Sequence, residues 1–343
     1  MSDGGERGSA DRAESAESAE SAEDASTGEA SESVTTVLIA MGANLLIAIA
    51  KSVAAVLTAS AAMVAEAAHS WADTGNQVLL FLAQKRSARP ADATHPLGYG
   101  KDAYIWSMFA AFGLFTAGAV LSIQHGIREL VAAEPGADYL VAYLVLAAAF
   151  VLEGISFVRA LRQARAAARE RSAATLTHVL ASSNPTLRAV FAEDSAALLG
   201  ILLAGSGLLL HQLTGDPVWD ALASILIGVL LGVVAVVLIA RNRAFLLGQV
   251  VSERARDEAL DWLQGRAVVE RVTYLHIEYV GPSRVLLVAA VDLVGDDRES
   301  RVAERLRDLE LELEREPEVA EAVLTLSRPA AAPLTASSAR RTR

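Results

Sequence analysis

Six long apolar segments restrict what this chain can fold into. They lie at residues 34–58, 61–84, 103–127, 138–160, 187–211 and 218–240, and each can cross about 30 Å of hydrocarbon as an α-helix. Inside a bilayer only helices and closed barrels satisfy every backbone hydrogen bond. We therefore expect an α-helical membrane protein with six transmembrane helices, the first two forming a hairpin around Ser60.

Acidic residues are concentrated before the first apolar segment. The net charge is −11, and residues 1–33 contribute −8 of it through ten acids and two arginines. This repetitive Ala-Glu-Ser stretch has too little apolar surface to fold and lacks a secretory signal pattern, so we expect a disordered acidic tail. The predicted domains are a membrane domain at 34–243, a soluble domain at 244–329 and a disordered basic tail at 330–343.

The soluble domain shows alternating and amphipathic patterns in place of long apolar runs. Residues 252–265 and 297–314 are predicted to be helices, and residues 268–279, 284–293 and 318–327 are predicted to be strands, with a turn at Gly281-Pro282. This α-β-β-α-β order is sufficient for a small two-layer domain.

Basic residues mark one side of the membrane. They fall in the loops after spans two, four and six, whereas the opposite loops carry few of them. By the positive-inside rule these loops face the cytoplasm, and six spans then place both termini there. The alanine- and arginine-rich composition favours a bacterial plasma membrane. The basic residues are Lys85, Arg86, Arg89, Lys101, Arg162, Arg165, Arg169, Arg171, Arg188, Arg241 and Arg243.

A polar stripe runs along the second span. It consists of Glu66, His69, Asp73 and Asn76, spaced three, four and three residues apart on one helix face. Ionisable groups are costly in lipid, and an imidazole one turn from a carboxylate is a ligand pair for a divalent transition metal. His69 and Asp73 are therefore the first candidate ligands. Glu66 fits a mouth residue, a proton carrier or a helix contact, and Asn76 fits packing as well as binding.

The fifth span adds two adjacent acids, Glu193 and Asp194, ahead of a long apolar run. Neighbouring residues differ by about 100° around a helix, so we expect one of the two to face the metal. The chain has no cysteine, so any site has only nitrogen and oxygen ligands, which disfavours copper(I).

Other polar residues in the spans fit structural roles better. Lys51 is expected to snorkel or to pair with an acid such as Glu153. Asp220 stands where it can cap the sixth span. In the loop before the third span, His95 is a candidate surface ligand.

Together these features resemble the cation diffusion facilitator family. The likeness runs from Val34 to Pro329 and includes the six spans, the His69 and Asp73 pair, the loop His95-Pro96-Leu97-Gly98-Tyr99-Gly100-Lys101 and a metallochaperone-like terminal domain. The resemblance implies a homodimer that exports a divalent metal in exchange for protons. It also implies a transport site shared by spans two and five, with Asp194 as the span-five aspartate.

One departure from that pattern leaves the metal open. Zinc exporters of the family usually carry His-x-x-x-Asp in span five, but Val190 stands where the histidine would be. Glu193 beside Asp194 and the Tyr279-Val280-Gly281-Pro282 turn look instead like the branch that contains the ninth human zinc transporter. One imidazole with two or three carboxylates suits zinc first, and also manganese, iron(II) or cobalt. His276 is the one histidine of the terminal domain, so a regulatory metal site there looks depleted.

Two other classes of function remain open at this point. The chain would be a membrane receptor or scaffold if its polar stripe only held helices together, or an organic-cation carrier if its acids were counter-charges. It has no phosphate-binding glycine loop and no nucleophile paired with a base, so we expect no enzyme and no cofactor. The expected partners are divalent metal ions, protons, lipid and a second copy of the chain, with no nucleic acid.

Overall fold

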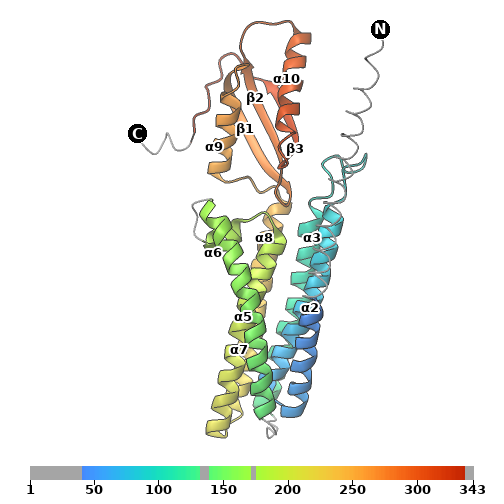
Figure 1. Ribbon diagram of the computed structural model, residues 1–343, viewed down its shortest axis with the longest axis vertical. Coiled ribbons are helices and arrows are strands. Elements are labelled where there is room, and N and C mark those ends of the chain that lie inside the picture. Colours follow the sequence, from blue (N-terminus) through green and yellow to red (C-terminus); the bar gives the residue numbers. More distant parts are fainter. Residues whose placement is uncertain (1–40, 132–138, 171–174, 337–343) are drawn as a thin grey trace, which may run out of the picture.

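A helical bundle and a small sheet domain follow one another along the long axis of the molecule (Figure 1). The computed structural model describes residues 41–131, 139–170 and 175–336. The tail predicted at residues 1–33 and the last residues of the basic tail lie outside this range.

The bundle consists of long helices that match the apolar segments. They are Met41–Thr58, α2 (Ala61–Ser87), α5 (Tyr139–Glu170), α7 (Pro185–Thr214), α8 (Val218–Leu246), and a third span made of α3 (Asp102–Ala110), a π-helical segment (Ala111–Phe115) and α4 (Thr116–Val131). A short helix, α6 (Thr175–Ala181), follows α5. Among the described residues five spans are long and apolar enough to cross a bilayer, and α2, with its polar stripe, completes the bundle.

Helix α2 occupies the middle of the bundle. It contacts α3, α4, α7 and α8, and Trp71 Nε1 donates a 3.0 Å hydrogen bond to Ser52 Oγ of the helix Met41–Thr58. Small residues allow the close packing: its buried positions include Ala61, Ala62, Ala65, Ala67 and Ala72. The polar stripe is therefore enclosed by protein instead of facing lipid.

Asp220 caps a different helix from the one the sequence suggested. Its carboxylate accepts hydrogen bonds from Ser60 Oγ at 2.8 Å and from the Ala61 backbone N–H at 2.6 Å, both at the start of α2. The first turn of its own helix, α8, is instead bonded by Asp216, whose Oδ1 accepts from Val218 N at 3.0 Å. The sequence correctly predicted that Asp220 caps a helix, but it named α8 as that helix. Asp220 caps α2 instead, because its side chain faces the turn before α2.

Arg188 ties three helices together at the end of the bundle near the sheet domain. The sequence counted it among the loop charges, but it begins α7 and is only 2% exposed. It donates to the Ser182 carbonyl and, at 2.6 Å, to Asn242 Oδ1 of α8. Asn242 in turn donates to Ser107 Oγ of α3 at 3.0 Å. The Arg188 guanidinium also lies 4.7 Å from the centre of the Phe245 ring.

The terminal domain has the predicted α-β-β-α-β order. It comprises α9 (Glu253–Gln264), β1 (Val269–Gly281), β2 (Arg284–Leu293), α10 (Glu299–Leu313) and β3 (Val319–Leu326). The sheet order is β1-β2-β3, antiparallel between β1 and β2 and parallel between β2 and β3. Leucines of α9 and α10 pack with inward residues of all three strands in one core. Together with the helical bundle, this domain confirms the predicted fold class.

The chain beyond the predicted domain end remains attached to the sheet. The Leu334 backbone N–H donates to the Val272 carbonyl at 2.8 Å, and the Leu334 side chain packs against the core. Arg271 donates to the carbonyls of Pro329 and Ala331. Residues 330–336 are thus part of the folded domain, although the sequence placed them in an unstructured tail.

Two glycines bring the domain and the bundle into contact. A Cβ added at Gly100, in the loop before α3, would lie 2.7 Å from the Cα of Gly281 at the end of β1. Beside them, the Phe245 and Tyr279 rings meet edge to face with centroids 5.5 Å apart. Only glycine allows this approach of the two backbones.

The Asp220 cap generates a stability prediction. Asp220→Ala should destabilise the protein by about 1–3 kcal/mol, because it leaves buried donors at the start of α2 without their acceptor. Thermal unfolding in detergent measures the change. Asp216→Ala is the matched control, since Asp216 is exposed and its loss should cost less. An equal fall in Tm for the two variants would contradict the buried-cap role.

Candidate metal site

The polar stripe of α2 is buried along its whole length. Glu66, His69, Asp73 and Asn76 are all exposed by 6% or less. They lie on the face of α2 that meets its neighbours in the bundle, so the spacing in sequence translates into one line of polar atoms inside the protein.

His69 and Asp73 form the centre of this line. His69 Nδ1 lies 3.5 Å from Asp73 Oδ1, and neither ring nitrogen of His69 nor Asp73 Oδ1 has a hydrogen-bond partner among the described residues. Buried polar atoms without partners are rare and costly in native proteins. An imidazole and a carboxylate with free lone pairs in a protected interior are suited to an incoming cation.

The two acids of α7 point to different neighbours. Glu193 Oε1 accepts a hydrogen bond from Asn76 Nδ2, which links α7 to α2. Asp194 Oδ2 accepts a 2.9 Å hydrogen bond from Ser156 Oγ of α5. This divergence follows from the angle of about 100° between adjacent residues on a helix.

The four predicted ligands lie in one region of the bundle, but their side chains do not converge on a single position for an ion. The charges of Glu153, Glu66 and Asp194 act on Asp73, and those of Asp73 and Asp194 act on Glu193. Within the described ranges, however, no three His, Asp or Glu side chains are arranged to hold an ion together. The structure pairs His69 with Asp73 and Asn76 with Glu193, while Asp194 is bonded to Ser156.

The partner of Lys51 differs from the one that the sequence suggested. Lys51 Nζ lies 2.8 Å from Glu66 Oε2, both side chains are completely buried, and the charge of Glu153 acts on Lys51 without an ion pair between them. Lys51 therefore does not snorkel, and Glu66 serves as a helix contact. Ser156 was not among the sequence candidates, because a single serine in an apolar span carries no signal of its own.

His95 and His276, the other histidines considered, lie outside this region. His95 is half exposed in a loop organised by Asp92, which accepts hydrogen bonds from Thr94 and Tyr99 that hold its pKa well below the usual range for an aspartate. His276 Nε2 lies 3.3 Å from Glu278 Oε2 on the partly exposed face of β1. Neither histidine contributes to the α2 stripe.

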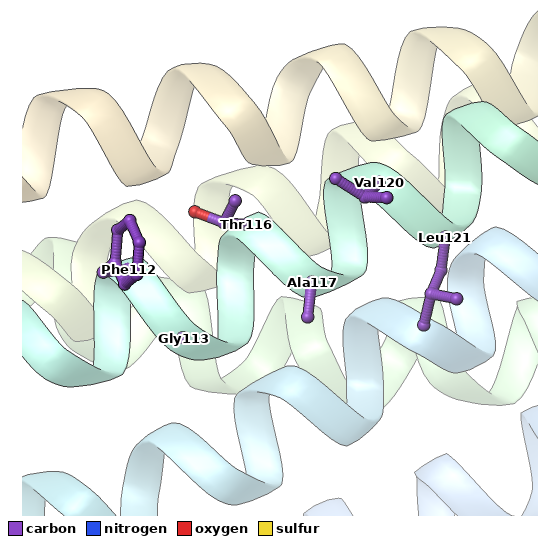
Figure 2. Close-up of a pocket in the computed structure, with 6 residues that line it drawn as sticks. All are labelled: Phe112, Gly113, Thr116, Ala117, Val120 and Leu121. Atoms are coloured by element: carbon purple, nitrogen blue, oxygen red, sulfur yellow. The ribbon is translucent and has the colours of Figure 1, made fainter.

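A groove on the bundle surface offers no ligands. Figure 2 shows its lining, which comes from the π-helical segment and the start of α4. The side chains are apolar apart from the Thr116 hydroxyl and none is ionisable, so we assign the groove no role in binding metal. The lining residues are Phe112, Gly113, Thr116, Ala117, Val120 and Leu121.

Known proteins resemble this chain over most of its length. Residues 37–247 match the family model described as the cation efflux transmembrane domain. The chain is 33% identical over 238 residues to metal tolerance protein C4 of Arabidopsis thaliana, which covers 69% of this chain and 52% of that protein. It is 34% identical over 259 residues to the mitochondrial proton-coupled zinc antiporter SLC30A9 of Homo sapiens, covering 76% of this chain and 46% of that protein.

A more distant relative is the magnetosome protein MamB of Magnetospira, 27% identical over 186 residues, or 54% of this chain and 58% of that protein. The chain spans about half the length of the curated relatives that it matches.

The bond between Asn76 and Glu193 can be tested through stability. Asn76→Leu should lower the free energy of unfolding by about 1–3 kcal/mol, since Glu193 would lose its buried donor. Adding Glu193→Leu should recover most of the loss, because both polar partners are then removed. Chemical denaturation in detergent measures both. Gln77→Leu is the control, since Gln77 Oε1 has no partner among the described residues; an equal loss there would refute the interhelical bond.

Proposed function

The chain belongs to the cation efflux family, and from this we propose that it carries a divalent metal ion across a membrane by proton antiport with alternating access. The relatives named as zinc antiporters and a metal tolerance protein support metal as the cargo. The metal is the transported substrate and not a resident cofactor.

The observation that carries this proposal is the unsatisfied pair at the centre of α2. Among the described residues, neither buried ring nitrogen of His69 has a hydrogen-bond partner, and the neighbouring Asp73 Oδ1 also lacks one. A buried histidine whose only role was to hold helices together would have hydrogen-bond partners for its ring nitrogens. We assign His69 and Asp73 as ligands from α2 and Asp194 and Glu193 as ligands from α7.

Closing the site requires the α7 acids to exchange partners. Asp194 has to leave Ser156, and Glu193 has to leave Asn76, before their oxygens join His69 and Asp73 on one ion. Two or three carboxylates then balance the double charge, which makes binding in a dry interior affordable.

Protons compete for the same groups. Metal binds only to a neutral imidazole and ionised carboxylates, so binding releases protons and protonation expels metal. On the side where protons are more concentrated the ligands recapture them and the ion leaves. One site thus serves both substrates in turn, which is the requirement for exchange.

The loop charges support an orientation for the chain, and membership of the efflux family supports export. We assign the end of the bundle with the sheet domain to the cytoplasm, as the basic loops indicate, and a bacterial plasma membrane as the location. Metal then enters from the cytoplasm and leaves on the opposite side. Zinc is the first candidate because related chains are named zinc antiporters; a donor set of one imidazole and carboxylates also accepts manganese, iron(II) or cobalt.

Loss of either α2 ligand should abolish exchange. His69→Ala and Asp73→Ala are each expected to remove Zn²⁺-dependent proton flux in reconstituted vesicles. Helix α2 has one histidine and one aspartate, so no second residue of the same kind on it can replace the lost ligand. Thr74→Ala is the control, because Thr74 Oγ1 bonds only the Ser70 carbonyl of its own helix. Repeating the assay with manganese, iron(II), cobalt and cadmium identifies the preferred ion. Normal flux in either ligand variant would rule out the scheme.

We further propose that the protein works as a homodimer joined through its sheet domain. One face of the sheet packs on α9 and α10. The opposite face alternates apolar side chains such as Tyr274 and Val323 with acids such as Glu278 and Glu321. The strand register brings His276, Val288 and Val323 into one row on this open face. A second copy of the same domain, packed on this face about a two-fold axis, would cover its apolar side chains.

The open face generates a test of assembly. Residues 245–343, which contain their own core, should sediment as a dimer at high micromolar concentration. Val323→Arg, at an exposed position of β3, should convert the dimer to a folded monomer, because it places a charge in the apolar contact. Analytical ultracentrifugation with circular dichroism measures both. A wild-type monomer would count against this interface.

A further inference from the structure

The ion pair between Lys51 and Glu66 lies directly beside the proposed transport site and has no part in the scheme above. Its atoms Nζ and Oε2 are 2.8 Å apart, and both side chains are 0% exposed. The pair joins the helix Met41–Thr58 to α2, one turn from His69. Burying two charges carries a large desolvation cost that their attraction has to offset, and apolar residues of similar volume often hold helices equally well.

The ammonium of Lys51 stands among acids. Besides Glu66, the carboxylates of Glu153 and Asp73 act on its charge, and Lys51 acts in turn on His69. Lys51 therefore shares the electrostatic field that an incoming metal ion would meet. At the distances of neighbouring side chains in a protein interior, one unit charge changes the binding of a divalent ion strongly.

Glu66 has an unused oxygen. Its Oε2 accepts from Lys51, but its buried Oε1 has no hydrogen-bond partner in the part of the chain that the structure describes and faces α7 at Gly200. A side chain at position 200 would collide with that oxygen. Glu66 is thus held between three helices, on the same stripe as His69, with one carboxylate oxygen free. Without Lys51 it would be a further anionic ligand for the ion.

We propose that Lys51 is an affinity-setting residue: its ammonium occupies Glu66 and keeps that carboxylate away from the transported metal. The donor set is then limited to His69 and the acids at positions 73, 193 and 194, and the ion is bound weakly enough to be released. This inference rests on the proposed function, because it needs a metal at His69 and Asp73.

The test compares four full-length proteins: the wild type, Lys51→Gln, Glu66→Gln and the double variant. Lys51→Gln should lower the Zn²⁺ Kd by at least about tenfold, and both KM and kcat for transport should fall, because the ion binds tightly and leaves slowly. Glu66→Gln should raise the Kd, since it leaves the ammonium unbalanced beside the site. The double variant should return to nearly the wild-type Kd, because the pair has no net charge.

Binding is measured by calorimetry in detergent at pH 8, where protons compete least, and flux is measured in vesicles. Lys51→Arg, which keeps the positive charge, should bind Zn²⁺ like the wild type. A folded Lys51→Gln protein with an unchanged Kd would overturn the inference. If that variant does not fold, Glu66→Gln decides: an unchanged or tighter Kd overturns the inference. A wild-type protein that neither binds nor moves Zn²⁺ would overturn the proposed function as well, so the two failures are distinguishable.

Discussion

The arrangement of the helices depends on one constraint: ionisable side chains are costly to keep in a medium of low dielectric constant. Helix α2 carries three ionisable side chains and an amide on one face, and an isolated helix of this kind would be poorly stable in lipid. The other helices of the bundle enclose that face, and three of them supply a specific partner: Lys51 for Glu66, Glu193 for Asn76, and Asp220 for the start of the helix. The bundle is built around α2 because α2 cannot face hydrocarbon on that side.

The unpartnered atoms are informative because so many others are satisfied. Near His69 and Asp73 the Asn76 amide and the Ser156 hydroxyl bond the acids of α7, whereas among the described residues both ring nitrogens of His69 lack a partner, as does the adjacent Ser70 hydroxyl. Under the proposed function, the transported cation supplies the partner that these atoms lack. The acids of α7 are held by single hydrogen bonds to Asn76 and Ser156, and such bonds are weak enough to exchange when a cation arrives.

Local patterns predicted the elements of this fold well, and contacts between distant residues were the part that failed. Apolar length and alternation gave the spans and all five elements of the sheet domain. They could not show that Asp220 caps a helix 160 residues away, that Lys51 selects Glu66 over Glu153, or that Ser156 holds Asp194. Those pairings depend on the rotation and depth of each helix, which neighbouring helices set. Helices α5 and α8 also extend beyond their apolar segments, because helical structure does not stop where hydrophobicity does.

The contact between Gly100 and Gly281 has a mechanical consequence. The two backbones touch with no side chain between them. Because no flexible side chain can absorb a movement, a displacement of one backbone moves the other. Gly100 lies in the segment that connects α2 to α3, and Gly281 ends β1. Movement of the sheet domain at Gly281 is therefore passed first to the start of α3, which packs against the helix that holds His69.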